Sequence, residues 1–334
     1  MPPPEAAPRP LVDPFSRTVR DLRISVTDRC NLRCTYCMPA EGLSWVPRAE
    51  VLTYEELSRV ARVCVERFRF DAIRITGGEP TVRADLPRLV EMLAGLGVDL
   101  AMTTNGLTLP LLGEGLRRAG LRRVNISLDS LRAERFAQIT RRDQLGAVLA
   151  GIDAAVAAGF DPVKVNSVLV RGVNDDEIVE LATFGRDKGV GVRFIEFMPL
   201  DADGGWTGRS VVTAEEVVAA VDAVYPLEAV EARGAQPAER YRYRDGRGEI
   251  GVIASVTRGF CSSCDRVRLT ADGKFRNCLF AVRETDLRAV LRRGGSDDDL
   301  AAAIEADVGA KWAGHGIGQV SFVRPSRSMS QIGG

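Results

Sequence analysis

Short apolar and β-branched runs alternate with longer stretches of helical periodicity between residues 22 and 197. Runs of about four to eight such residues are typical of buried strands, whereas apolar residues that recur every three to four positions are typical of amphipathic helices. The short runs predict strands at Leu22–Val26, Ala72–Thr76, Leu100–Thr103, Arg123–Ser127, Pro162–Val168 and Val192–Phe197. The longer stretches predict helices at about Tyr54–Phe68, Asp85–Gly95, Leu109–Ala119, Leu145–Ala158 and Asp175–Lys188.

Three helix starts carry a capping signal, a Thr or Asn that precedes a glutamate by three positions. The pairs are Thr53 with Glu56, Asn174 with Glu177, and Thr213 with Glu216. Strands that alternate with helices form parallel sheets with right-handed crossovers, so the chain is of the α/β class. A partial (β/α)6 TIM-like barrel and a doubly wound sheet fit this pattern almost equally well. In both, functional side chains gather at the carboxyl ends of the strands.

Composition narrows the function classes. The 334 residues include 45 basic and 45 acidic side chains, and this balance argues against a long nucleic-acid backbone or an anionic membrane surface as the partner. No apolar run reaches the length of a membrane span, and the N-terminus resembles no secretory signal, so we expect a cytoplasmic protein. The single histidine, His315, excludes a multi-histidine zinc site, and we interpret it as a surface or structural residue.

Six of the seven cysteines fall into two groups, which in a reducing compartment indicates metal binding. The first group, Cys30, Cys34 and Cys37, has the spacing C-x3-C-x2-C and follows the first predicted strand. Soft thiolates select zinc, copper(I) or iron–sulfur clusters, but the fourth ligand that a closed site needs is missing here. A cubane on three cysteines has one iron open to a ligand. Cys64 lies on an apolar helix face and is predicted to be buried without a ligand role.

The second group, Cys261, Cys264 and Cys278, has the spacing C-x2-C-x13-C and again lacks a fourth thiolate. A zinc site completed by an outside ligand is one interpretation, and a second open cubane is the other. Strand alternation places Arg266 and Arg268 on one side of the segment between these cysteines. Paired guanidinium groups suit a polyanion, because their forks match phosphate oxygens.

The first cysteine motif, together with the turn Gly77-Gly78-Glu79-Pro80 after the second strand, resembles the radical S-adenosylmethionine superfamily. The resemblance favours the partial barrel. It implies a [4Fe-4S] cluster whose open iron binds S-adenosylmethionine and cleaves it to a 5′-deoxyadenosyl radical. Glycines leave room for backbone to approach a ligand at the turn. By the same resemblance, the residues around S-adenosylmethionine are Tyr36, Gly78, Ser127 and Met198.

Both cysteine groups, the segment from Arg266 to Lys274 and the terminal Gly333-Gly334 together resemble the GTP 3′,8-cyclase family, also called the molybdenum cofactor biosynthesis protein A family. The resemblance implies a lyase with two [4Fe-4S] clusters. It converts GTP to (8S)-3′,8-cyclo-7,8-dihydroguanosine 5′-triphosphate by abstracting the ribose 3′ hydrogen, an early step of molybdenum cofactor biosynthesis. The implied GTP contacts are Arg23, Arg74, Thr103, Asn105, Lys164, Arg193, Arg266 and Arg268. The last two and the Gly333-Gly334 tail are implied to serve catalysis.

Two positions depart from the family pattern. Ala72 stands where a lysine is frequent, and Asp265 stands where an asparagine is expected. We divide the chain into a proline-rich disordered arm (1–12), the radical S-adenosylmethionine partial barrel (13–235) and a C-terminal auxiliary-cluster region (236–334). The expected partners are GTP and an external electron donor, with no nucleic acid and no membrane, and the chain is expected to be a monomer or homodimer.

Two alternatives remain. One is a different radical S-adenosylmethionine enzyme with an auxiliary cluster, such as a peptide maturase, although such enzymes usually carry more cysteines in the C-terminal part. The other is a non-catalytic zinc or electron-transfer protein with six structural cysteines.

Overall fold

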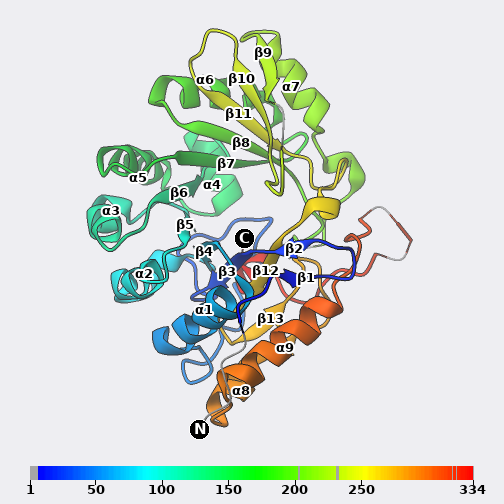
Figure 1. The fold of residues 1–334 in the computed structure, drawn as a ribbon. Coiled ribbons are helices and arrows are strands. Elements are labelled where there is room, and N and C mark those ends of the chain that lie inside the picture. The colour runs from blue at the N-terminus through cyan, green and yellow to red at the C-terminus, as the bar shows by residue number, and fades with distance from the viewer. Residues whose placement is uncertain (1–6, 202–203, 231–232, 318, 321, 334) are drawn as a thin grey trace.

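The computed structural model describes residues 7–201, 204–230, 233–317, 319–320 and 322–333. Its centre is a curved, mainly parallel sheet with helices on its outer face (Figure 1). The six predicted strands are adjacent, parallel and in sequence order. They are β3 (Asp21–Ser25), β4 (Ala72–Thr76), β5 (Asp99–Thr104), β6 (Arg123–Ser127), β7 (Val163–Leu169) and β8 (Gly191–Glu196). This order has no switch point, so the partial barrel is confirmed and the doubly wound alternative is wrong.

The predicted helices are also present. They are α1 (Tyr54–Phe68), α2 (Leu86–Ala94), α3 (Leu109–Arg118), α5 (Leu145–Ala157) and α6 (Ile178–Lys188). A further helix between β6 and α5, α4 (Ala133–Thr140), was not predicted. Short 3-10 turns occupy Pro80–Val82, Asp175–Glu177, Gly208–Ser210 and Cys261–Ser263.

The C-terminal third extends the barrel sheet at both edges. Beyond β8 come β11 (Glu249–Ile253), β10 (Glu239–Tyr243) and β9 (Leu227–Val230), and β11 is parallel to β8. Beyond β3 come β12 (Arg266–Leu269), β13 (Lys274–Arg276) and β14 (Thr285–Asp286), and β12 is parallel to β3. The remaining helices are α7 (Ala214–Asp222), α8 (Leu287–Arg292), α9 (Asp297–Gly309) and α10 (Met329–Ile332). The division between residues 235 and 236 stays a prediction.

Part of the predicted N-terminal arm is ordered. Residues 1–6 lie outside the described residues, but Leu11–Val12 forms β1 and pairs with β2 (Thr18–Val19). Leu11 is buried and belongs to the hydrophobic core, and β1 packs against α9. The prediction of disorder is therefore wrong for residues 11 and 12, because the apolar side chain of Leu11 packs into the hydrophobic core.

Two of the three capping signals are confirmed. Thr53 and Glu56 exchange side-chain and backbone hydrogen bonds at the start of α1, and Thr213 and Glu216 do so at α7. The third is wrong. Asn174 instead donates its amide to the carbonyl oxygens of Asp129 and Val168.

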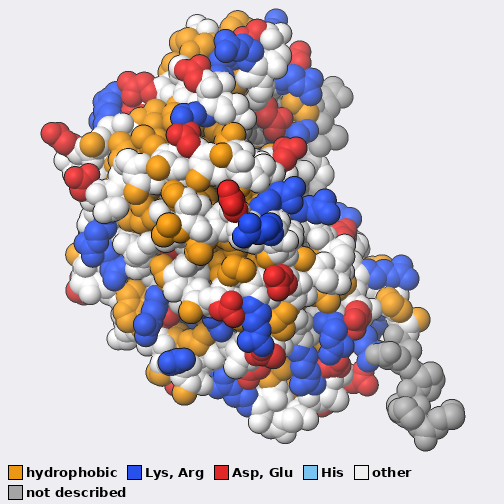
Figure 2. Space-filling model, turned by 90° about the vertical axis from the view of Figure 1, so that its left-hand side faces the viewer, with side chains coloured by type: hydrophobic (Ala, Val, Ile, Leu, Met, Phe, Trp, Pro, Cys, Tyr) orange, Lys and Arg blue, Asp and Glu red, His pale blue; other side chains and the backbone are white. Residues whose placement is uncertain are grey.

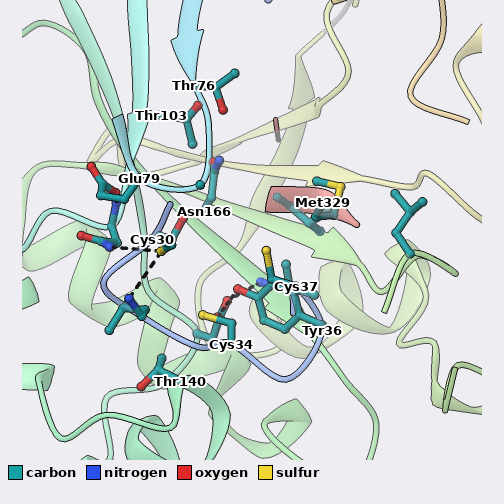
Figure 3. Close-up of a pocket in the computed structure, with 18 of the residues that line it drawn as sticks. Cys30, Cys34, Tyr36, Cys37, Thr76, Glu79, Thr103, Thr140, Asn166 and Met329 are labelled. Carbon is teal, nitrogen blue, oxygen red and sulfur yellow. Dashed lines mark hydrogen bonds between the residues drawn. The ribbon is translucent and has the colours of Figure 1, made fainter. Parts of the chain in front are cut away.

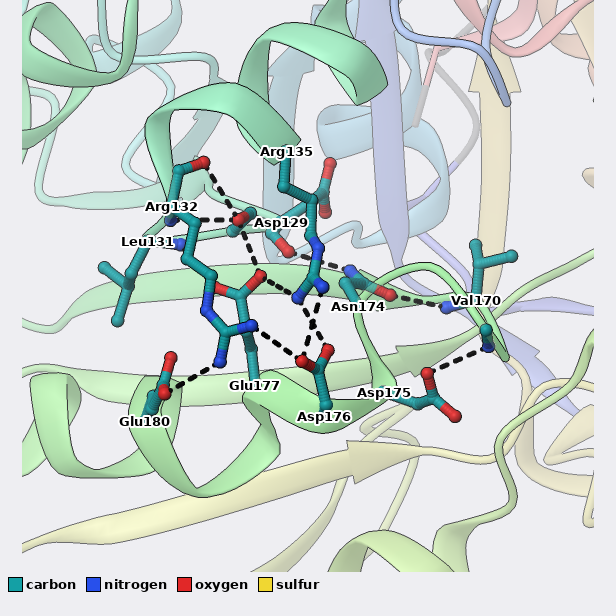
Figure 4. A network of polar contacts seen from close by, with 12 residues as sticks. Asp129, Leu131, Arg132, Arg135, Val170, Asn174, Asp175, Asp176, Glu177 and Glu180 are labelled. Carbon is teal, nitrogen blue, oxygen red and sulfur yellow. Dashed lines mark hydrogen bonds and ion pairs between the residues drawn. The ribbon is translucent and has the colours of Figure 1, made fainter.

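Glu177, the predicted capping partner of Asn174, is buried. Glu177 accepts from Ser130 Oγ and Leu131 N and forms an ion pair with Arg135 (Figure 4). The loops after β6 and β7 therefore use both side chains as tethers, so neither caps a helix.

Strand alternation separates an apolar outer layer from a polar lumen. Leu22 and Ile24 of β3 are buried in the core under the helices, while Arg23 between them lines the barrel interior. The interior of a closed TIM barrel is usually filled by branched apolar side chains. A polar lumen therefore indicates that the site extends down into the barrel.

The outer face over α2, α3 and α5 shows acidic and basic side chains interspersed with apolar ones (Figure 2). In the described part of the chain, no helix has the length and apolar character needed to cross a bilayer.

Candidate active site

The first three cysteines lie on the loop that leaves β3 and line a hollow at the carboxyl ends of the strands (Figure 3). The Gly77-Gly78 turn after β4 packs directly against this loop. Gly78 N donates to Thr27 O at 2.8 Å, and a Cβ on Gly78 would lie 2.4 Å from Arg29 O. The sequence predicts close approach of a ligand at these glycines. In the structure they permit close approach of the cysteine loop itself.

The buried carboxylate of Glu79 joins the ends of β4 and β5. It accepts hydrogen bonds from Thr81 Oγ1 (2.6 Å), Thr104 Oγ1 (2.7 Å) and Asn105 N (2.6 Å). The Asn105 amide in turn donates to Asn31 Oδ1 at 2.6 Å, beside Cys30. Asn105, which the family resemblance assigns to GTP, thus lies in the first hollow and supports the cysteine loop.

Burial dominates the electrostatics of the first cysteine group. It raises the pKa of Cys30 to about 11 and of Cys37 to about 12, and that of Cys34 well above its usual value. Metal coordination reverses this, because a coordinating thiol is deprotonated outright. Tyr36 donates its hydroxyl to Asp129 Oδ2 at 2.6 Å, and burial raises the pKa of Asp129 to about 6.

The structure brings together all four residues that the resemblance assigns to S-adenosylmethionine. They line the first hollow along with the three cysteines: Tyr36, Gly78, Ser127 and Met198. Asp129, on the same wall, was not predicted. Its only sequence signal is its position at the end of β6.

The second three cysteines line a second hollow. Cys261 lies in a 3-10 turn, Cys264 precedes β12, and Cys278 follows β13. With them are five of the predicted GTP-binding cations, namely Arg23, Arg74, Arg193, Arg266 and Arg268. The remaining predicted cation, Lys164, lines a different hollow at the opposite ends of the strands with Gly191 and Glu249. Burial, followed by the charge of Arg193, lowers the pKa of Lys164 to about 8.

Buried cations that the sequence did not single out hold the second cysteine loop. Arg17 is paired with Asp13 at 2.5 Å, and it donates to the carbonyl oxygens of Cys261 (2.6 Å) and Ala313 (2.9 Å). Lys311 Nζ donates to Arg266 O at 2.8 Å. No local pattern marks their role, because the carbonyl oxygens to which they donate are distant in the sequence.

His315 is a structural residue inside the second hollow and does not lie on the surface. Its ring lies 5.1 Å from that of Phe280, and its Nδ1 accepts from Ile317 N at 3.1 Å. Burial lowers the pKa of His315. Cys64 is fully buried in the apolar core, as predicted.

The two hollows adjoin, because the same residues line both. The shared residues are Thr103, Asn166, Ile195, Met198 and Met329. Both cysteine groups therefore face one chamber. Within the described residues no three His, Cys, Asp or Glu side chains converge on a single metal ion. A cubane is held differently, since each thiolate binds a different iron, and the thiols of each group are close enough to influence one another's pKa.

Three arginines form a row across the chamber. Arg268 of β12 is in register with Arg23 of β3, which is in register with Arg74 of β4. Like charges directly opposite each other destabilise a sheet. Burial, together with repulsion from neighbouring arginines, lowers the pKa of Arg23 to about 9 and of Arg74 to about 10, and lowers that of Arg268 well below its usual value.

Two arginines of the row, and Arg266 beside it, also carry unsatisfied donors. Among the described residues, no hydrogen-bond partner reaches the buried atoms Arg23 Nε, Arg74 Nε and Nη1, or Arg266 Nε and Nη2. Buried polar groups are normally paired, so orphaned guanidinium nitrogens indicate an absent anionic ligand. Asn166 Oδ1 is likewise unpaired, and Asn125 lines the same hollow. Asn125 was not predicted, although alternation along β6 places it beside Thr103 and Lys164.

The two departures from the family pattern have local consequences. Ala72 is opposite Asp21, whose buried Oδ1 has no hydrogen-bond partner among the described residues. A lysine at position 72 would be next to that carboxylate. Asp265 lies 4.0 Å from Arg20, which compensates part of its charge, and burial raises its pKa.

The C-terminal tail enters the chamber. Ser25 Oγ donates to Ile332 O at 3.0 Å, and Arg268 Nη1 donates to Gly333 O. Gly333 has φ +87°, and a Cβ there would lie 2.1 Å from Ser25 Oγ, so only glycine fits. Gly334 lies outside the described residues.

Comparisons with known proteins agree with this geometry. The Radical SAM superfamily model matches residues 24–185, and the Molybdenum Cofactor Synthesis C model matches residues 190–317. The fold is similar to that of Streptococcus suis SuiB bound to S-adenosylmethionine, with a TM-score of 0.58, 12% identity, and coverage of 87% of this chain and 69% of that one. It is also similar to methylornithine synthase, with a TM-score of 0.52, 16% identity, and coverage of 86% of both chains. Fold and site together define a radical S-adenosylmethionine enzyme.

Sequence relatives define the family. The chain is 50% identical to the GTP 3′,8-cyclase of Corynebacterium glutamicum, over 99% of this chain and 91% of that protein. It is 48% identical to the GTP 3′,8-cyclase of Streptomyces coelicolor, over 97% of this chain and 96% of that protein. The chain belongs to the GTP 3′,8-cyclase family.

Proposed function

We propose that this chain converts GTP to (8S)-3′,8-cyclo-7,8-dihydroguanosine 5′-triphosphate, using S-adenosylmethionine and two [4Fe-4S] clusters. The observation that carries the proposal is the row of buried arginines with unsatisfied nitrogens, located between two groups of three cysteines in one chamber. A triphosphate supplies the multiple negative charges and the oxygen acceptors that this row lacks.

Cys30, Cys34 and Cys37 would hold the first cluster, and Cys261, Cys264 and Cys278 the second. When reduced, a first cluster with one open iron supplies the electron that cleaves S-adenosylmethionine into methionine and the 5′-deoxyadenosyl radical. Tyr36, Gly78, Ser127 and Met198 line the hollow where that cofactor would be held.

The substrate would lie in the second hollow, with its phosphates on the arginine row. There the 5′-deoxyadenosyl radical would take the ribose 3′ hydrogen atom, the 3′ carbon would bond to C8 of guanine, and one electron and one proton would complete the product. The chain contributes orientation, charge and exclusion of water, so it needs no acid–base residue for the difficult step. We assign Arg266, Arg268 and Gly333 to orienting the substrate, which the position of both arginines in the second hollow and the bond from Arg268 to Gly333 support, and we keep Gly334 as a prediction.

An external one-electron donor is needed for both electrons. We keep a monomer or homodimer in the cytoplasm as our prediction, together with the division into residues 1–12, 13–235 and 236–334.

Anaerobic reconstitution followed by iron and sulfide analysis tests the proposal. About eight irons per chain, four for each cubane, would support two clusters. Incubation with S-adenosylmethionine, a reductant and each nucleoside triphosphate in turn should then form 5′-deoxyadenosine most rapidly with GTP. Zinc without iron, or equal rates with all four nucleotides, would contradict the proposal.

A further inference from the structure

The tail inside the chamber contacts both cysteine-bearing halves of the molecule. Met329 lines both hollows, and Ser330, which is buried, hydrogen-bonds with the thiol of Cys37. Ile332 and Gly333 are bound by Ser25 and Arg268, as described above. The last described residues therefore form part of the chamber wall.

These contacts do not by themselves explain why the tail stays in place. Helix α10 is four residues long, whereas isolated helices shorter than about 12–15 residues are marginal in water. The preceding segment, residues 312–327, contains no regular helix or strand among its described residues. A contact at the entry to the chamber would therefore add to those that hold the tail inside it.

Arg327 is at that entry and makes forked contacts with two carboxylates. Its Nη1 and Nη2 donate to the two oxygens of Asp272, at 3.2 and 2.8 Å, and its Nε lies 2.8 Å from Glu284 Oε1. The three side chains are 19%, 11% and 19% exposed, so water screens these ion pairs only in part.

The two carboxylates are themselves fixed. Asp272, in the turn between β12 and β13, accepts from Thr270 Oγ1 at 2.6 Å, and Glu284 is paired with the buried Arg276. Planar, bidentate pairing of this kind restrains geometry as well as adding energy. Arg324, three residues earlier, offers a contrast, because it is 37% exposed and lies 3.8 Å from Asp201.

We propose that Arg327 is a positioning residue that fastens the C-terminal tail to Asp272 and Glu284, and thereby keeps Met329 to Gly333 in the chamber. The assignment of that chamber to GTP rests on the proposed function, whereas the fastening itself does not. Loss of the fastening would release the Gly333 carbonyl from Arg268 and open the chamber to water.

Amide hydrogen exchange by mass spectrometry on the anaerobically reconstituted enzyme tests the fastening. In Arg327→Met and in Asp272→Asn, the amides of residues 329–333 should exchange at least about tenfold faster than in the unmodified enzyme, since each change breaks the forked pair. Arg324→Met is the matched control and should leave this exchange unchanged. Iron content and exchange in α1 should be the same in all four proteins.

Unchanged exchange at residues 329–333 in both variants would overturn the proposal. So would faster exchange throughout the molecule, because it would mean general destabilisation. If Arg327→Met does not yield folded protein, Asp272→Asn and Glu284→Gln carry the test.

A second readout separates the positioning role from the proposed function. With GTP, Arg327→Met should form less cyclised product per 5′-deoxyadenosine, because the radical becomes exposed to water. An unchanged ratio would contradict that consequence. If the unmodified enzyme does not convert GTP at all, the proposed function fails, while the exchange result still decides whether Arg327 fastens the tail.

Discussion

The arginines that line the chamber favour binding of an anionic ligand, and they lower the stability of the ligand-free protein. Arg268, Arg23 and Arg74 share one row of the sheet, and several of their nitrogens lack partners. Asp21 attracts Arg23 and Arg74 and offsets part of the cost of burying these cations, but the row as a whole destabilises the ligand-free state. The alternating pattern predicted which strands carry the arginines. It could not predict the row, which depends on the pairing of β12 with β3.

Replacing Arg74 should therefore have opposite effects on stability and binding. Arg74→Met should raise the melting temperature of the GTP-free protein, because it removes one repelling buried charge. It should weaken GTP binding by about 10- to 100-fold, the worth of a hydrogen bond to a charged group. Calorimetric unfolding and equilibrium binding measure the two effects. Arg118→Met, on the surface of α3 and 79% exposed, is the control and should change neither. A destabilised Arg74→Met with normal GTP affinity would contradict the arrangement.

The lowered pKa of Lys164 predicts that the stability of the protein and its GTP affinity depend on pH. This pKa is lowered from 10.5 to about 8 in the folded protein, so between these values the unfolded chain binds more protons than the native one. Burial of the charged lysine therefore lowers the free energy of unfolding most below pH 8, and this penalty is relieved as pH rises toward 10.5. The family resemblance assigns Lys164 to GTP, although the residue lines a different hollow. On that assignment GTP affinity should fall as pH rises through 8, because the lysine loses its charge. In Lys164→Met this part of the affinity profile should be flat, and an unaltered profile would exclude Lys164 from GTP binding.

Secondary-structure elements followed the hydrophobic pattern closely in the barrel, where each repeating unit buries one apolar face. Prediction failed where tertiary contacts outweigh local signals. Asn174 and Glu177 have the spacing of a capping pair, but they are used to tie the loops after β6 and β7 together. Arg17 has a local ion-pair partner in Asp13, but the carbonyl oxygens to which it donates lie about 240 to 300 positions further along the chain.

The hairpin of β1 and β2 should be required for the second cluster, because Arg17 joins it to the loop of Cys261. Arg17→Met would leave the Asp13 carboxylate buried without its partner and the carbonyl of Cys261 without a donor. We expect anaerobically reconstituted Arg17→Met to retain about four irons per chain, one cubane, where the unmodified chain holds about eight. Cys64→Ala, which removes a buried thiol outside both groups, should keep the full iron content. Equal iron in Arg17→Met and the unmodified chain would contradict this role.

At the scale of the whole molecule, the C-terminal third completes the barrel's site by adding strands at both edges of its sheet. The cysteine motifs predicted two three-thiol groups. That they would face one chamber could not be read from spacing, because it follows from β11 pairing with β8 and β12 with β3. The position of Asn105 beside Cys30, and of Lys164 at the opposite ends of the strands, follows from the packing of the barrel's own loops and strands.

The two cysteine groups should be separable by mutation. Cys34→Ala should abolish 5′-deoxyadenosine formation, since we propose that the first cysteine group holds the cluster that cleaves S-adenosylmethionine. Cys264→Ala should chiefly lose GTP binding and cyclised product. Chromatographic measurement of 5′-deoxyadenosine and product in both variants decides this. A Cys34→Ala enzyme that still forms 5′-deoxyadenosine would remove the first group from that role.

The most direct test of the central claim, that one chamber brings the radical to the ribose of GTP, follows a label. The reconstituted enzyme is incubated anaerobically with S-adenosylmethionine, reductant and GTP deuterated at the 3′ position, and 5′-deoxyadenosine is analysed by mass spectrometry. The claim predicts that one deuterium appears in 5′-deoxyadenosine. Unlabelled 5′-deoxyadenosine, formed while GTP is consumed, would contradict it.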